Sequence, residues 1–149
     1  MKIKNYTSKV PVVRTIAGIE TLLAAAGASS ITKEYGPTGQ PVALTFQIEI
    51  ALDRPLRVRL PADIEACMEA LWRGDQSRRR RGRKQREEFR EQAVRTAWRL
   101  QHDWVAVQLS LIQLKQLEPL QAFLAYVWDG SQTFYHRLRT QQFKALNPA

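Results

Sequence analysis

The feature that most constrains the fold is a run of strict alternation between residues 42 and 52. Small or polar residues separate the apolar ones. The apolar positions are Val42, Leu44, Phe46, Ile48, Ile50 and Leu52. A period of two over eleven residues is typical of a β-strand with one buried face. Residues 56–60 alternate in the same way, and residues 30–35 end at a Gly-Pro-Thr-Gly turn. We predict a three-stranded antiparallel meander, and residues 2–13 are a candidate for a fourth, edge strand, although Pro11 limits where they can pair.

Two helices are predicted to cover the apolar side of this sheet. Thr15 is placed to cap the first helix, in which apolar residues recur on one face until Gly27. Residues 64–72 carry apolar side chains at helical spacing, and Gly74 follows them. Residues 1–74 are therefore expected to form an α+β layer.

Residues 86–149 are expected to form a helical region. Pro119 is placed to begin a short helix that ends near residue 128, and Ser131 to cap another that ends near residue 142. Before them, apolar residues at intervals of four and three predict a long helix over about 85–117: Ala93, Ala97, Leu100, Trp104, Val107, Leu111 and Leu114. Short connections favour a hairpin or bundle, completed by the N-terminal layer or by a second protomer. Trp104 is expected in the core.

The net charge is concentrated in one part of the chain. The 149 residues carry a formal charge of +9, and residues 73–99 hold eleven basic and four acidic side chains. Residues 75–85 contain no apolar side chain, and their like charges repel one another, so they are predicted to form a flexible basic linker. The predicted fold class is α+β: a small antiparallel sheet of three to four strands with two helices on one face, this linker, and a C-terminal helical hairpin or bundle.

A focal block of arginines attracts polyanions, because guanidinium groups hydrogen-bond phosphate in pairs and release condensed counterions. Aromatic side chains near cations stack on unpaired bases. The candidate nucleic-acid-binding residues are Arg78, Arg79, Arg80, Arg81, Arg83, Lys84, Arg86, Arg90, Arg95, Arg99, Trp98 and Trp128. The alternatives are a solvated linker for the arginine run, surface pairs with Glu91 and Asp103 for Arg95 and Arg99, and burial for the two tryptophans.

The composition argues against other chemistry. One cysteine, Cys67, and two histidines exclude an internal disulfide and a zinc site of four cysteines or of two cysteines and two histidines. No signal peptide or membrane-spanning run is present, so an intracellular, soluble protein is expected. His102 and Asp103 are adjacent on a helix, which is poor geometry for a catalytic pair. We expect no catalytic residues, no metal site, no cofactor and no enzymatic activity.

Several short motifs lie along almost the whole chain: Tyr6-Thr7-Ser8-Lys9-Val10-Pro11, Leu60-Pro61-Ala62, Thr96-Ala97-Trp98 and Asp103-Trp104-Val105. They resemble a family of small proteins from tailed phages and prophages for which no function is established. The resemblance implies a phage or prophage origin and a location in the bacterial cytoplasm during infection. It implies no activity and no functional residues.

The leading functional hypothesis is a non-enzymatic phage protein that binds nucleic acid, with single-stranded DNA favoured, in replication or recombination. The rival hypothesis is a protein-interaction module that uses the long helix to dock on a host protein or within the virion assembly. A third interpretation, a regulator of duplex DNA, would use residues 132–141 as its recognition helix. The apolar stripe of the long helix also leads us to expect a homo-oligomer through Leu100, Val107, Leu111 and Leu114.

Overall fold

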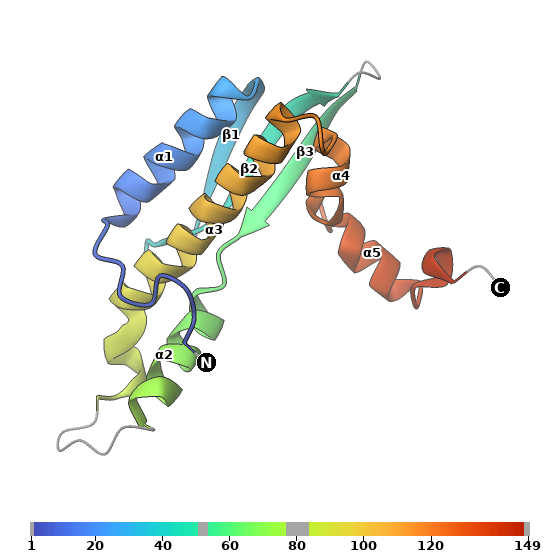
Figure 1. The fold of residues 1–149 in the computed structure, drawn as a ribbon. Coiled ribbons are helices and arrows are strands. Elements are labelled where there is room, and N and C mark those ends of the chain that lie inside the picture. The colour runs from blue at the N-terminus through green and yellow to red at the C-terminus, as the bar shows by residue number, and fades with distance from the viewer. Residues whose placement is uncertain (1, 51–53, 77–83, 148–149) are drawn as a thin grey trace.

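The computed structural model describes residues 2–50, 54–76 and 84–147. One antiparallel sheet has the strand order β1-β2-β3, with β1 at Ala28–Tyr35, β2 at Pro41–Ile50 and β3 at Arg54–Pro61 (Figure 1). The helices are α1 (Val12–Ala25), α2 (Ile64–Gln76), α3 (Arg90–Gln113), α4 (Pro119–Phe123) and α5 (Phe134–Thr140), and the 3-10 turns are η1 (Arg86–Phe89), η2 (Leu124–Tyr126) and η3 (Lys144–Leu146). The predicted α+β class and the meander are confirmed.

The register of the sheet follows from the alternation in β2. Phe46 of β2 lies opposite Ile31 of β1 and Val58 of β3, and Phe46 and Val58 are buried against the helices. The residues between them, such as Thr45 and Gln47, face the opposite side of the sheet, because successive side chains of a strand alternate. The prediction of a fourth strand at the N-terminus is wrong, since residues 2–11 form no strand and lie across α3 instead.

The two helices that cover the apolar face are α1 and α3, which lie side by side (Figure 1). The prediction that α2 shares this face is wrong: α2 continues past the end of β3 and packs against the N-terminal half of α3. Only Ala62 and Asp63 separate β3 from α2, and the Asp63 carboxylate accepts a hydrogen bond from the Ala66 N–H in the first turn. This short, capped connection does not return the chain over the sheet.

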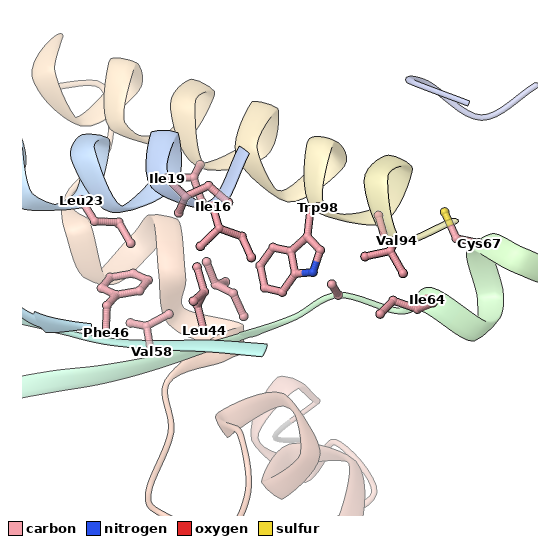
Figure 2. Packing of buried hydrophobic residues seen from close by; sticks show 14 of the residues in the cluster. Ile16, Ile19, Leu23, Leu44, Phe46, Val58, Ile64, Cys67, Val94 and Trp98 are labelled. Carbon is pink, nitrogen blue, oxygen red and sulfur yellow. The ribbon is translucent and has the colours of Figure 1, made fainter. Parts of the chain in front are cut away.

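A single hydrophobic core joins the two predicted regions. Its residues come from α1, the sheet, α2, α3 and α4, and Figure 2 shows Trp98 of α3 between Ile16, Leu44 and Val94. Trp98 has no exposed surface, and its indole Nε1 donates to the Pro41 carbonyl at 2.9 Å. The helical region predicted at 86–149 is therefore completed by the N-terminal layer, because α3 supplies part of that layer's core.

Trp98 is buried in the core, the position expected of Trp104, and Trp104 is the more exposed of the two side chains. Trp104 is partly exposed and packs edge-to-face against Phe123 and Tyr126, with ring centroids 5.7 and 5.3 Å apart. The buried face of α3 takes in Ala93 and Ala97 of the predicted seam together with Val94, Trp98 and Val105, each of which follows a seam position by one residue. The N-terminal part of the predicted seam is therefore buried as expected, while its end at Val107 and Leu114 is exposed.

The ends of several helices also differ from the prediction. The N-cap of α1 is Pro11, and Thr15, the predicted cap, is buried within the helix. The N-cap of α5 is Thr133 in place of Ser131, because the Thr133 side chain accepts from the N–H of His136. The predicted helix at 119–128 is shorter and tightens into η2 after Phe123.

Candidate nucleic-acid interface

The arginine segment, residues 77–84, joins α2 to η1. Arg78, Arg79, Arg80, Arg81 and Arg83 lie outside the residues that the structure describes. On its flanks, the Gln76 side chain donates to the Lys84 carbonyl and the Lys84 N–H donates to Asp75 Oδ2, both at 3.4 Å. The segment therefore begins and ends at one place, beside two helices that pack against each other (Figure 1).

Arg86 and Arg90, two of the predicted phosphate contacts, are ion-paired with carboxylates. Arg86 donates to Glu69 at 2.9 Å and to Glu65 at 3.0 Å, while Arg90 donates to Glu65 and to Glu87 at 3.0 Å. Hydrogen bonds from Arg86 and Arg90 lower the pKa of Glu65 below its ordinary value. These pairs connect α2 to η1 and the start of α3, so a phosphate would have to displace a carboxylate to reach either guanidinium.

Arg95 lies on a polar stripe of α3 that holds the N-terminal strap, which we define as residues 2–11. Its guanidinium donates to the Ser8 carbonyl at 3.3 Å and to Gln92 Oε1 at 2.7 Å. Gln92 donates to the carbonyls of Tyr6 and Ser8, at 3.1 and 3.0 Å, and Thr96 donates to the carbonyl of Asn5 at 3.0 Å. Arg95, a candidate phosphate contact, thus belongs to the stripe that binds the strap.

Asp103 fixes the other end of the strap. Its carboxylate accepts hydrogen bonds from Lys4 and, at 2.9 Å, from Asn5, and it pairs with Arg99 at 3.6 Å. His102 Nδ1 lies 3.1 Å from Asp103 Oδ1, so these two side chains meet although they are adjacent on the helix, a geometry that we expected to be poor for such a pair. Burial acts to raise the pKa of Asp103, but the hydrogen bonds from Lys4, Asn5 and His102 outweigh it and lower the pKa.

The two candidate stacking residues have different surroundings. Trp98 is enclosed in the core, so its assignment to base stacking is wrong. Trp128 is partly exposed, and the Arg59 guanidinium lies 5.1 Å from the centre of its ring. The main-chain N–H of Trp128 donates to the Arg57 carbonyl at 2.8 Å. The sequence places Arg57 and Arg59 on the polar side of β3, but it does not predict that Trp128 lies beside them.

The single cysteine, Cys67, is a buried free thiol. Burial raises the pKa of the Cys67 thiol to about 11, which disfavours the reactive thiolate at neutral pH. Residues 2–50, 54–76 and 84–147 contain no group of three or more His, Cys, Asp or Glu side chains that could hold a metal ion. Within the same ranges, no helix has the length and apolar character needed to span a membrane.

Comparison of the chain with known protein families, curated proteins and solved structures finds no match.

Proposed function

We propose that this is a non-enzymatic nucleic-acid-binding protein that contacts the phosphate backbone through the arginine segment. The observation that supports this function most directly is the local charge between Asp75 and Glu87. Residues 76–86 hold seven cations and no acidic side chain, and hydrogen bonds across Asp75, Gln76 and Lys84 bring the flanks together. We call this hydrogen-bonded pair of flanks the closed base of the segment. Because the segment starts and ends there, its charges belong to one region of the surface, where a concentrated positive potential attracts a polyanion.

Carboxylates near the arginine segment have arginine partners outside it. Glu65, Glu69 and Glu87 already have Arg86 and Arg90 as partners. The segment itself holds six cations: Arg78 to Arg81, Arg83 and Lys84. At about −0.7 per phosphate contact on a single strand, six contacts give a slope of roughly −4 for log K against log salt.

The biological setting is part of the proposal. The resemblance to small phage proteins favours a location in the bacterial cytoplasm during infection, and a nucleic-acid-binding protein there would act in replication or recombination of phage DNA. Single-stranded DNA is the favoured ligand, because aromatic side chains near cations can stack on its unpaired bases.

The test replaces Arg78, Arg79, Arg80 and Arg81 with alanine and measures binding of a labelled oligonucleotide by fluorescence anisotropy. We expect weaker binding to every sequence and a salt slope that is smaller by about 2.8 between roughly 50 and 200 mM salt. The matched control removes four other cations, by exchange of Lys2, Lys9, Arg14 and Lys115 for glutamine, all of which are exposed. Equal loss of affinity in both variants would mean that net charge alone drives binding, which would refute a site at the segment.

A protein-interaction module is the second candidate, and one observation favours it. Val107 and Leu114 of the long helix region are 54% and 68% exposed, and Leu111 lies between them at helical spacing. Apolar residues at intervals of four and three on an exposed helix face are typical of a helix that docks into a groove. Absence of binding to single-stranded and duplex oligonucleotides at low salt would favour this function over the first.

A further inference from the structure

A tight turn, residues 127–134, extends the outer edge of β3, and we refer to it as the edge turn. Val127 forms an antiparallel bridge with Val58, and Trp128 donates from its N–H to the Arg57 carbonyl. Trp128 also bridges Thr133 on the returning side of the turn. Main-chain pairing therefore places Trp128 next to the side chains of β3.

Hydrogen bonds hold the edge turn in one conformation. Asp129 Oδ1 accepts from the N–H groups of Ser131 and Gln132, both at 2.8 Å, and Asp129 Oδ2 accepts from Arg137. These donors, Gln132 first, lower the pKa of Asp129, so the carboxylate stays charged at neutral pH. Gly130 has a φ of 106°, and a Cβ atom there would lie 3.4 Å from Arg57 Nη2. The turn thus passes closely over the Arg57 guanidinium.

The Trp128 indole is positioned from the sheet by a second arginine. Arg59 lies 5.1 Å from the ring centre, and its guanidinium makes two hydrogen bonds to Glu34 of β1, at 3.0 and 2.7 Å. Glu34 thus fixes Arg59, and Arg59 in turn fixes the indole by a cation–π contact. A ring that is fixed before binding loses little conformational entropy when a ligand stacks on it.

Arg57 differs from the other cations of this surface. Arg59 is paired with Glu34 and Arg137 with Asp129, whereas the exposed Arg57 forms no ion pair with any carboxylate in the described part of the chain. An exposed guanidinium without a carboxylate partner is available for two hydrogen bonds to a phosphate.

We propose that Trp128 and Arg57 form a single-strand subsite, in which an unpaired base stacks on the indole and the neighbouring phosphate binds Arg57. This inference rests on the proposed function, and it adds the source of a preference for single strands. In a duplex both faces of every internal base are covered by neighbouring bases, so only an unpaired strand can offer a base to the indole. The arginine segment contacts backbone alone and would bind either form.

The test compares Trp128→Leu and Trp128→Phe with the parent protein, using an oligothymidylate and a duplex of the same length as probes. Loss of one stacked base weakens single-strand binding by roughly 5- to 150-fold, and we expect this for Trp128→Leu with duplex affinity changed less than about twofold. Trp128→Phe keeps an aromatic face and should recover most of the affinity. Arg57→Gln should reduce the single-strand salt slope by about 0.7, while Arg14→Gln, an exposed control on α1, should leave single-strand affinity relative to duplex unchanged.

Indole fluorescence provides a second readout that does not depend on affinity. A base stacked on Trp128 quenches its emission, so oligothymidylate should quench the parent and a Trp72→Phe variant, and should quench Trp128→Phe much less. Trp72 is a suitable control because it is partly exposed on α2, away from the edge turn. Far-UV circular dichroism establishes that each variant keeps the parental fold.

The outcomes separate the subsite from the proposed function. Unchanged oligothymidylate affinity in Trp128→Leu, with binding lost in the four-arginine variant, would overturn the subsite and leave the function standing. Equal weakening toward single strand and duplex would also overturn it, because stacking cannot account for duplex binding. If the parent binds neither probe at low salt, both proposals are wrong.

Discussion

Replacement of Trp98 by alanine should be the most destabilising aromatic truncation in the chain. The side chain is fully buried, and burial of a tryptophan removes about 150–250 Å² from water, which corresponds to roughly 4–6 kcal/mol. Measured substitutions of buried Trp by Ala cost about 3–5 kcal/mol. The exchange also leaves the Pro41 carbonyl without its donor, at a further cost of about 1 kcal/mol. We expect a loss of about 4–6 kcal/mol in the free energy of unfolding.

Urea denaturation followed by far-UV circular dichroism measures this loss, with Trp104→Ala as the comparison. Trp104 is already partly in water, so its truncation should cost less, about 2–3 kcal/mol. Trp98→Phe keeps one ring and loses the hydrogen bond, and should cost about 1–3 kcal/mol. If Trp98→Ala loses less than about 1 kcal/mol, or less than Trp104→Ala, then the buried face of α3 is misplaced and the argument from burial fails.

Two further predictions concern the strap and the outer face of α3. Asp103→Asn removes the charged acceptor of Lys4 and Asn5 and should lower the free energy of unfolding by about 1–2 kcal/mol at neutral pH, measured by urea denaturation. Because folding lowers the pKa of Asp103, its contribution is present above the ordinary carboxylate pKa of about 4 and is lost as the pH falls. The free energies of unfolding of parent and variant should therefore become equal in acid. A difference between them that does not change with pH would contradict this. We also expect association through Val107, Leu111 and Leu114, so that light scattering gives a mass above 17.1 kDa that returns to 17.1 kDa in Leu114→Lys. A parental mass of 17.1 kDa at every concentration would exclude the oligomer.

The sheet could be predicted because its pattern of apolar residues fits a strand and does not fit a helix. Alternation from Val42 to Leu52 is incompatible with a helix, whose period is 3.6 residues, and the flanking turns determine the antiparallel order. The spacing of apolar residues likewise predicted α1, α2 and α3 close to their observed positions.

The orientation of α3 could not be derived from its own sequence. Apolar residues occupy more than one face of this helix, and both the row through Trp104 and the row through Trp98 fit helical spacing. The choice between them depends on where α1 approaches, and at Gly18 a Cβ atom would lie 3.2 Å from the His102 ring. Such a close approach is a property of two helices together, which a pattern within one helix does not record.

The strap and the edge turn were missed for a different reason. Asn5, Tyr6 and Ser8 bind α3 through their main-chain carbonyls, and Trp128 reaches β3 through its main-chain N–H. Every residue carries these groups, so the side chains of Tyr6 and Ser8 do not mark the hydrogen bonds that their carbonyls accept. The arginine segment was prominent in composition, but its closed base depends on Asp75, Gln76 and Lys84 meeting in space.

The shared core has a consequence for the order in which the chain is made. The sheet is complete at Pro61, but α3, which covers much of its apolar face, ends at Gln113. At synthesis rates of about 5–20 residues per second, the ribosome needs roughly 3–10 s to make the intervening fifty or so residues. During that interval only α1 is available to cover the face that α1 and α3 share in the finished protein, so Leu44 and its neighbours lack the Trp98 side chain that packs on them. A nascent chain of this kind depends on rapid completion, or on a chaperone, to avoid aggregation.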